Sequence, residues 1–174
     1  MAGGAVAEHN IVLTGFMGSG KSSVGAALAA VLGRRFVDTD AVIAERYGPI
    51  PAIFAEHGEA AFRTREQELA DELAGETALV VSTGGGMLID PAIAERFESS
   101  GRVFCLTASP ATTIARVRAD GIVDRPLLDT ADPEARVAKL LAERSEAYAR
   151  FEAVPTDGRT VAEIVDDILI RIRG

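Results

Sequence analysis

The segment Gly15–Ser22, with the sequence GFMGSGKS, constrains the fold more than any other part of the chain. It follows a short apolar run, Ile11–Thr14, and precedes a pattern typical of a helix from Lys21 to Leu32. A G-x-x-x-x-G-K-[ST] loop between a strand and a helix points backbone N–H groups at phosphate oxygens, and the helix N-terminus adds partial positive charge. We therefore expect a nucleotide-phosphate site here; a glycine-rich turn without a ligand is the alternative.

Two side chains of this loop are expected to act directly on the nucleotide. Lys21 should reach the β- and γ-phosphates of ATP, and the Ser22 hydroxyl should be a ligand of Mg²⁺. The residues of this segment expected to bind ATP are Gly18, Ser19, Gly20, Lys21, Ser22 and Ser23. The motif indicates a nucleotide but does not indicate which molecule receives the phosphoryl group.

Short apolar runs alternate with helical patterns along the whole chain. After Ile11–Thr14, the runs expected to form strands are Phe36–Asp38, Leu79–Ser82, Val103–Leu106 and Ala153–Val154, and a last helix is expected near Val161–Ile172. Three helix starts combine a capping residue with a proline, namely Asp90–Pro91, Ser109–Pro110 and Asp132–Pro133. This order predicts an α/β fold, a three-layer αβα sandwich around a five-stranded parallel sheet.

The composition limits the number of domains and the partners. The 174 residues suffice for one domain, and 18 basic against 26 acidic residues give a net charge of −8. This balance argues against nucleic acid as a partner, although a few clustered cations can still bind a small anion. No apolar run approaches the roughly 20 residues of a membrane span. Residues 1–10 lack a signal-peptide pattern, and the single cysteine, Cys105, excludes an internal disulfide, so we expect a cytoplasmic protein.

The acidic pair Asp38 and Asp40 follows the second predicted strand, near the sheet edge where open α/β folds bind ligands. Residues i and i+2 of a strand share a face, so both carboxylates can face one site. One could hold water on Mg²⁺ while the other accepts a hydrogen bond from a substrate hydroxyl. The alternative is that Thr39 or Asp40 caps the next helix.

Two charged residues, Glu66 and Arg144, fall on helix faces that should be apolar. Arg63 lies three residues before Glu66, which shares the expected inward stripe of Phe62 and Leu69, and a buried carboxylate there needs a partner. Arg144 lies in the middle of an apolar face and needs an anion, either Glu66 or a ligand carboxylate. The alternatives are an exposed salt bridge for the first and an arginine that reaches solvent from the edge of the face for the second.

Two loops are candidates for ligand contact. Gly84–Gly86 ends the third predicted strand, and three consecutive glycines suggest a close approach of backbone to a ligand or to another loop, with a plain turn as the alternative. The Gly121–Thr130 segment follows Arg118 closely and contains Arg125, and an arginine there could close over ATP. Solvated loop charges are the alternative for both arginines.

Taken together, these segments resemble the shikimate kinases, small P-loop enzymes of the nucleoside monophosphate kinase-like group. The resemblance spans about residues 10–161. The segments that carry it are Gly15–Ser22, Asp38–Asp40, Ile53–Phe54, Gly58–Glu66, Gly84–Gly86 and Arg125–Leu128, followed by Arg144 and Tyr148.

The resemblance implies ATP-dependent phosphorylation of the 3-hydroxyl of shikimate, which gives shikimate 3-phosphate and ADP in aromatic amino acid biosynthesis. It also implies a core of about residues 10–38 and 76–174, substrate-binding helices of about 39–75 and a lid of about 119–130. The expected partners are shikimate and ATP with Mg²⁺, with no nucleic acid or membrane, and the expected oligomeric state is a monomer.

The resemblance also assigns roles to single residues. It implies that Asp40 meets the ring hydroxyls, that Arg63 and Arg144 clamp the carboxylate, and that Asp38 reaches Mg²⁺ through water. Arg125 would reach the phosphates from the lid, and Arg118 and Arg159 would lie near adenine. The full set implied to bind shikimate is Asp40, Phe54, Phe62, Arg63, Gly84, Gly85, Gly86, Pro126, Leu127 and Arg144.

The mechanism expected from these residues is in-line phosphoryl transfer in a site that excludes water. Lys21, Arg125 and Mg²⁺ would stabilise charge on the phosphates, and Asp40 would orient or deprotonate the attacking hydroxyl. Two other functions stay open at this point. One is a P-loop kinase that acts on a nucleoside monophosphate or on gluconate, and the other is a noncatalytic nucleotide-binding module.

Overall fold

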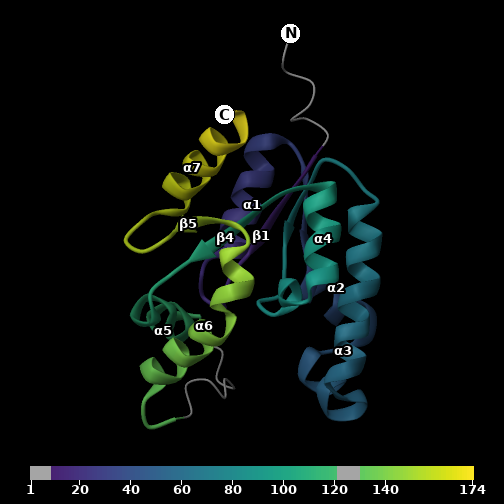
Figure 1. The fold of residues 1–174 in the computed structure, drawn as a ribbon, viewed down its shortest axis with the longest axis vertical. Coiled ribbons are helices and arrows are strands. Elements are labelled where there is room, and N and C mark those ends of the chain that lie inside the picture. Colours follow the sequence, from purple (N-terminus) through teal and green to yellow (C-terminus); the bar gives the residue numbers. More distant parts are fainter. Residues whose placement is uncertain (1–8, 121–129) are drawn as a thin grey trace.

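Five parallel strands in the order β2-β3-β1-β4-β5 form the centre of the computed structural model, which describes residues 9–120 and 130–174 (Figure 1). The strands are β1 (Asn10–Thr14), β2 (Arg35–Asp38), β3 (Leu79–Ser82), β4 (Gly101–Thr107) and β5 (Glu152–Pro155). In the central register, Val12 pairs with Val81 on one side and with Val103 on the other. The five-stranded parallel sheet predicted from the alternating pattern is confirmed.

The helices are α1 (Lys21–Leu32), α2 (Thr39–Tyr47), α3 (Ile50–Ala74), α4 (Pro91–Ser100), α5 (Pro110–Ala119), α6 (Pro133–Ala149) and α7 (Val161–Arg173), with a short 3₁₀ helix, Met87–Ile89. The three predicted capping residues are confirmed, because the side chains of Asp90, Ser109 and Asp132 each accept a hydrogen bond from the first turn of their helix. α3 is interrupted at Gly58, whose backbone is not helical.

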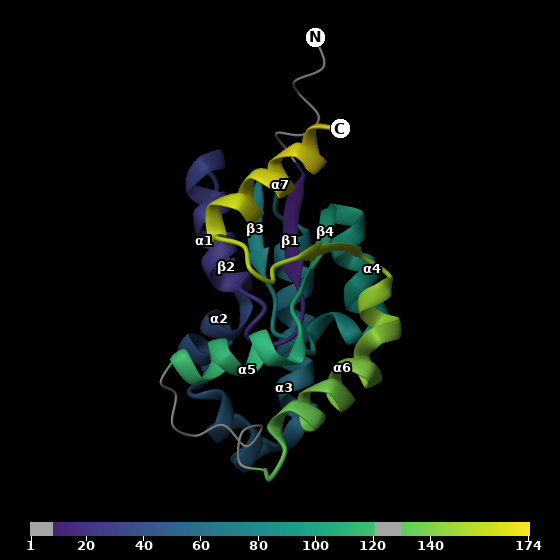
Figure 2. The ribbon, with the colours of Figure 1, turned by 90° about the vertical axis from the view of Figure 1, so that its left-hand side faces the viewer.

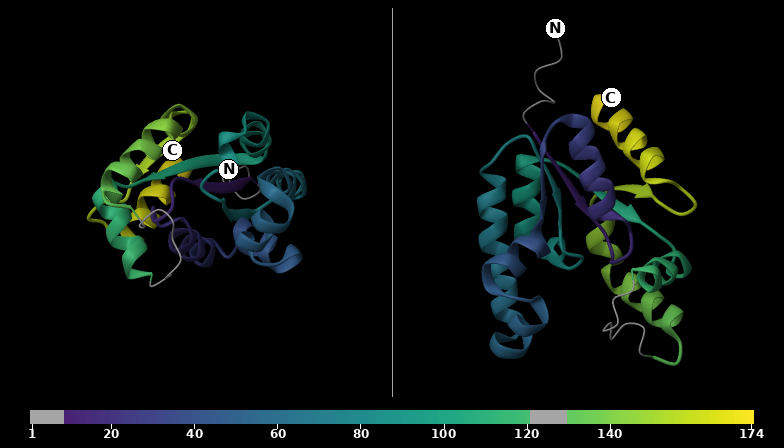
Figure 3. Two further views of the ribbon diagram at one scale, coloured as in Figure 1. Left: turned by 90° about the horizontal axis from the view of Figure 1, so that it is seen from below. Right: turned by 180° about the vertical axis from the view of Figure 1, so that it is seen from behind.

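Alternate residues of β1 divide the core into two layers. Ile11 and Leu13 pack in the cluster formed with α1 and α7, whereas Val12 packs in the cluster formed with α3 and α4. Figure 3 shows α1 and α7 together on one face of the sheet. The strand alternation therefore explains the three layers of the fold.

A third, smaller cluster lies at the carboxyl ends of the strands. Phe16, which follows β1 directly, packs with Ile114 of α5 and Val137 of α6. Figure 2 shows α5, α6 and part of α3 gathered below this edge of the sheet. The apolar second residue of the glycine-rich loop thus fixes the two helices that border the ligand site.

The prediction that Asp38 and Asp40 share one face of a strand is wrong. β2 ends at Asp38, whose Oδ1 accepts a hydrogen bond from the Ala41 N–H at 3.1 Å and caps α2. Asp40 therefore lies in the first turn of a helix, and the two carboxylates do not share a strand face. The alternative cap by Thr39 or Asp40 is also wrong, because a helix that begins at Thr39 needs its cap one residue earlier.

Asn10 joins β1 to the connection between α3 and β3. It is fully buried; its Nδ2 donates to the carbonyls of Glu76 at 2.9 Å and Leu73 at 3.3 Å, and its Oδ1 accepts from the Leu79 N–H at 2.9 Å. These three hydrogen bonds tie β1 to the end of α3 and to the start of β3.

We expect Asn10→Ala to lower the free energy of unfolding by about 1–3 kcal/mol, because buried backbone groups lose their partners. Urea unfolding followed by circular dichroism measures the change. Ser145→Ala, which removes an exposed hydroxyl bonded to its own helix, is the control and should change stability by less than about 0.5 kcal/mol. Equal midpoints for the two variants would contradict the prediction.

Candidate active site

The glycine-rich loop passes close to the end of β4. Gly15 has a φ of 137°, and a Cβ at this position would lie 2.3 Å from the Leu106 carbonyl oxygen. Only glycine fits both the backbone conformation and the space. The loop then leads directly into α1, which begins at Lys21, so its N–H groups and the helix N-terminus face the same region.

Lys21 lies folded against this loop. Its Nζ donates to the carbonyls of Gly15 at 2.8 Å and Phe16 at 2.9 Å. Burial lowers the pKa of Lys21 to about 8, an effect that the nearby Asp40 carboxylate partly opposes. The ammonium is therefore poorly solvated and is favourably placed to bind an anion.

Ser22 and Asp38 present a set of oxygen atoms beside Lys21. The Ser22 hydroxyl donates to Asp38 Oδ2 at 2.7 Å. A hydroxyl and a carboxylate within hydrogen-bond distance fit Mg²⁺, which prefers oxygen ligands and usually takes only one or two from the protein beside phosphate oxygens. Consistent with such a partial site, residues 9–120 and 130–174 hold no cluster of three or more His, Cys, Asp or Glu side chains that could bind a metal by itself.

A cavity of about 700 Å³ extends from the loop toward the start of α7. Its lining includes the expected nucleotide residues Gly18, Ser19, Gly20, Lys21, Ser22 and Ser23, together with Asp38, Asp40, Gly85 and Arg159. The structure therefore brings together one end of the glycine-rich loop, the acidic pair and the predicted adenine residue Arg159.

Arg116 also lines this cavity, although the sequence analysis did not single it out. Its guanidinium donates to the carbonyls of Gly18 at 3.0 Å and Thr156 at 2.9 Å, and to the Thr156 hydroxyl at 2.9 Å. The predicted residue, Arg118, is exposed and is absent from the lining. Helical spacing contained the signal, because Arg116 follows the inward-facing Thr113 by three residues and precedes the inward-facing Val117.

Asp40 lies under the turn that follows β3. The Thr39 hydroxyl accepts a hydrogen bond from the Gly84 N–H at 2.9 Å, and a Cβ at Gly84 would lie 2.6 Å from Asp40 Oδ1. Burial and the neighbouring Asp38 carboxylate raise the pKa of Asp40, against the opposite effect of Lys21. The close approach expected from the three glycines is thus an approach of backbone to a carboxylate.

A second cavity, of about 410 Å³, lies beside the first. Arg63 and Arg144 both line it, with Glu66 and Gly86, whereas the neighbouring Gly85 lines the first cavity. The structure thus brings the two predicted arginines together at the glycine turn, although they lie on different helices and 81 positions apart in the sequence.

The two arginines differ in their surroundings. Arg63 donates to Glu66 at 2.6 Å and to Glu59 at 3.1 Å, and the Glu66 side chain is only 2% exposed. Burial raises the pKa of Glu66, against the lowering by Arg63. Arg144 lies 5.1 Å from the centre of the Phe16 ring, and its Nη1 is 3.5 Å from the Gly85 carbonyl oxygen, so neither contact cancels its charge.

The other predicted substrate residues fall into two groups. Phe54 and Phe62 lie with ring centres 5.0 Å apart; Phe62 is buried and Phe54 is exposed, and neither is among the residues that line the two cavities. Arg125, Pro126 and Leu127 lie outside the described residues, as does most of the predicted lid.

Cys105 is buried within β4 and fits a core residue.

Comparisons with known proteins agree with this geometry. A family model described as shikimate kinase matches residues 17–173. The shikimate kinase of Geobacter metallireducens is 42% identical over 168 residues, which cover 95% of this chain and 93% of the relative. The shikimate kinase of Acinetobacter baumannii, solved in complex with shikimate, superposes with a TM-score of 0.86 at 36% identity and covers 95% of this chain and 93% of its own.

A more distant likeness shows the fold alone. A gluconokinase from Sinorhizobium meliloti superposes with a TM-score of 0.65 at 22% identity, over 95% of this chain and 91% of its own. No helix in the described part of the chain is both long enough and apolar enough to cross a membrane. With its glycine-rich loop, its paired arginines and near full-length relatives at 42% identity, the chain belongs to the shikimate kinase family.

Proposed function

We propose that this protein transfers the γ-phosphoryl group of ATP to the 3-hydroxyl of shikimate and so supplies aromatic amino acid biosynthesis. The single observation that carries the proposal is the convergence of Arg63 and Arg144 on one cavity beside the glycine-rich loop. Shikimate carries one carboxylate, which two guanidinium groups can bind in a fixed orientation. The solved relative from Acinetobacter baumannii, which holds shikimate, supports the same choice of substrate.

The two cavities divide the substrates between them. ATP occupies the cavity of about 700 Å³, with its phosphates against Gly18–Ser23, and shikimate occupies the cavity lined by Arg63 and Arg144. Gly85 and Gly86 are adjacent residues that line one cavity each, so the two substrates meet at this turn. Such a placement brings the donor phosphoryl group and the acceptor hydroxyl into reacting range.

Lys21 and Asp40 are the two residues of the described chain that act on the reacting groups. Lys21 exchanges its bonds to the loop carbonyls for bonds to β- and γ-phosphate oxygens, which offset the cost of its burial. Asp40 accepts a hydrogen bond from the 3-hydroxyl and takes its proton as the new O–P bond forms and the bond to ADP breaks. The turn at Gly84 packs against this carboxylate, which also lines the larger cavity and is therefore accessible from the nucleotide side.

Ser22 and Asp38 would hold Mg²⁺ in this site. The Ser22 hydroxyl would be a direct ligand, and the Asp38 carboxylate would bind the ion through water, as the family pattern implies. When bound, Mg²⁺ neutralises charge on the β- and γ-phosphates. The Asp38 carboxylate also caps α2, so the same side chain fixes the helix that carries Asp40.

Several roles remain predictions on the family pattern. Arg125 is the lid arginine that reaches the phosphates, and Phe54, Phe62, Pro126 and Leu127 form walls around the ring. Arg159 and Arg118 lie near adenine, and Gly84–Gly86 contacts shikimate. The division into core, substrate-binding helices and lid, the monomeric state and the cytoplasmic location are also predictions.

A coupled assay of ADP release tests the function. We expect ADP release to depend on shikimate in the presence of ATP and Mg²⁺, and Lys21→Met to lose turnover by several orders of magnitude, because the transferred phosphoryl group loses its main cation. Gluconate and nucleoside monophosphates serve as control acceptors. Turnover with one of them in place of shikimate, or nucleotide binding without turnover of any acceptor, would reject the proposal.

The charge on Arg144 is expected to determine shikimate affinity. Arg144→Met should raise KM for shikimate at least about tenfold, since a charged hydrogen-bond partner contributes roughly 1.5–3 kcal/mol. KM for ATP should stay within about twofold of the original value. The control is Lys139→Met, which removes an exposed cation from the same helix. An unchanged KM for shikimate in Arg144→Met would assign this arginine a purely structural role.

Arg116 and Arg118 form a matched pair for the nucleotide end of the site. We expect Arg116→Met to raise KM for ATP several-fold, because Arg116 ties Gly18 to Thr156 within the cavity lining. Arg118→Met, with the same charge change on an exposed side chain, should alter KM for ATP less. The opposite order of the two effects would favour Arg118, as the family pattern predicts.

A further inference from the structure

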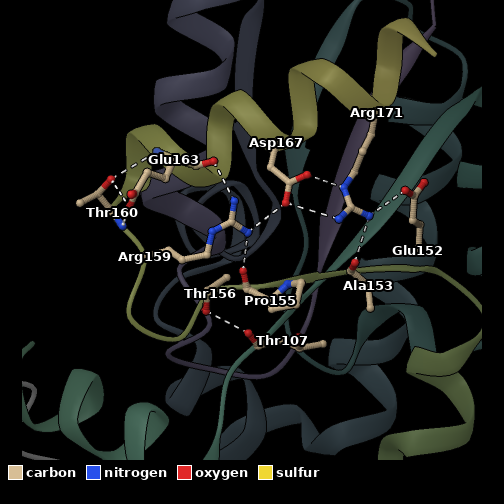
Figure 4. Close-up of polar contacts among 10 residues, drawn as sticks. All are labelled: Thr107, Glu152, Ala153, Pro155, Thr156, Arg159, Thr160, Glu163, Asp167 and Arg171. Carbon is tan, nitrogen blue, oxygen red and sulfur yellow. Dashed lines mark hydrogen bonds and ion pairs between the residues drawn. The ribbon is translucent and has the colours of Figure 1, made fainter.

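Arg159 lies between β5 and α7 and lines the cavity that also contains the glycine-rich loop. Its Nη1 donates to the Pro155 carbonyl and its Nη2 to the Glu163 carbonyl, both at 2.9 Å. Figure 4 shows the guanidinium held between the strand end and the helix. These two backbone bonds fix the plane of the group at the mouth of the cavity.

Asp167 completes the set of partners around Arg159. Its Oδ2 accepts from Arg159 Nη1 at 2.9 Å, and its Oδ1 accepts from Arg171 Nε at 2.7 Å. Both arginine side chains are less than one-third exposed. Hydrogen bonds from both arginines lower the pKa of Asp167, and the bond from Arg171 has the larger effect.

The row of charges continues away from the cavity. Arg171 Nη1 donates to Glu152 at 2.8 Å and to the Ala153 carbonyl at 3.3 Å (Figure 4). Glu152 also pairs with Arg102 at 2.9 Å. Asp167 is therefore itself held in place from β5. Such an alternating row positions each guanidinium more tightly than a single exposed ion pair could.

Arg159 and Lys21 line the same cavity but have different hydrogen-bond partners. Lys21 Nζ donates to two loop carbonyls, whereas Arg159 donates to two backbone carbonyls and to the Asp167 carboxylate, which it shares with Arg171. With its edge bonded to carbonyls and a carboxylate, a guanidinium still offers its flat face, which stacks on planar rings. Arg159 therefore suits a neutral base better than a phosphate.

We propose that Asp167 is a positioning residue for nucleotide binding. Asp167 is anchored by Arg171 and holds Arg159, so that the face of the Arg159 guanidinium stacks on the base of the nucleotide. This inference rests on the proposed use of ATP. It extends that proposal by making base recognition depend on a side chain of α7 that touches no substrate.

Binding measurements by calorimetry separate the base from the phosphates. ADP carries both, whereas inorganic tripolyphosphate carries phosphates alone. We expect Asp167→Asn to weaken ADP binding about three- to tenfold and to leave tripolyphosphate binding within twofold. Asp167→Glu should restore part of the lost ADP affinity. Asp166→Asn, the same change at the exposed neighbouring position, is the matched control and should alter neither ligand.

A double-mutant cycle adds a second readout. Arg159→Met should weaken ADP binding as Asp167→Asn does, and the double variant should be no weaker than Arg159→Met alone, because the carboxylate acts only through this arginine. Arg171→Met leaves the Arg159–Asp167 pair intact and should cause a smaller loss of ADP affinity. This variant tests the inference if the Asp167 variants fail to fold.

Three results would overturn the inference. Unchanged ADP affinity in Asp167→Asn, equal losses for ADP and tripolyphosphate, or additive losses in the cycle would each remove the positioning role while leaving the proposed function intact. Failure of the unmodified protein to bind ADP is a different outcome, because it would reject the proposed function itself.

Discussion

The contact between Gly84 and the first turn of α2 determines the shape of the whole site. The Thr39 hydroxyl holds the Gly84 N–H, and the missing side chain of Gly84 lets the backbone close over Asp40. This contact fixes the turn whose next two residues line the nucleotide cavity and the acceptor cavity. If the turn moved outward, Asp40 would lose the backbone that packs against it, and the two cavities would no longer meet at adjacent residues.

Buried charge is the second constraint, and the site meets it in two ways. Glu66 is compensated within the protein by Arg63, so this pair can keep its geometry without a ligand. Lys21 and Arg144 contact mainly carbonyl groups and an aromatic ring, which do not cancel a positive charge. A site with compensated and uncompensated cations side by side has a fixed shape and still a strong preference for anions.

The fold and most of the site could be predicted from the sequence, because their signals are local. Strand alternation, capping residues before prolines and the glycine-rich motif all lie within a few residues of the structure they specify. The geometry of Asp38 and Asp40 could not be predicted, because it depends on the residue at which β2 ends and α2 begins. With this boundary at Asp38, Asp38 caps α2 and Asp40 lies in the first turn of the helix, so the two side chains do not share a strand face. Arg116 is a different case: helical spacing could have shown that it faces inward, but its partners Gly18 and Thr156 lie 98 and 40 residues away, and only the folded chain identifies them.

The net charge of −8 is compatible with a site for two anionic substrates because the cations of the site are local and enclosed. A field from exposed charge is screened over about 8 Å in physiological salt, whereas groups inside a cavity interact through a less polarisable medium. The acidic exterior therefore has little effect on ATP or shikimate once they have entered, but it opposes a long polyanion that would have to lie along the surface. The distribution of charge, rather than its sum, thus reconciles an acidic chain with small anionic substrates, and the lack of a nucleic-acid partner stays a prediction.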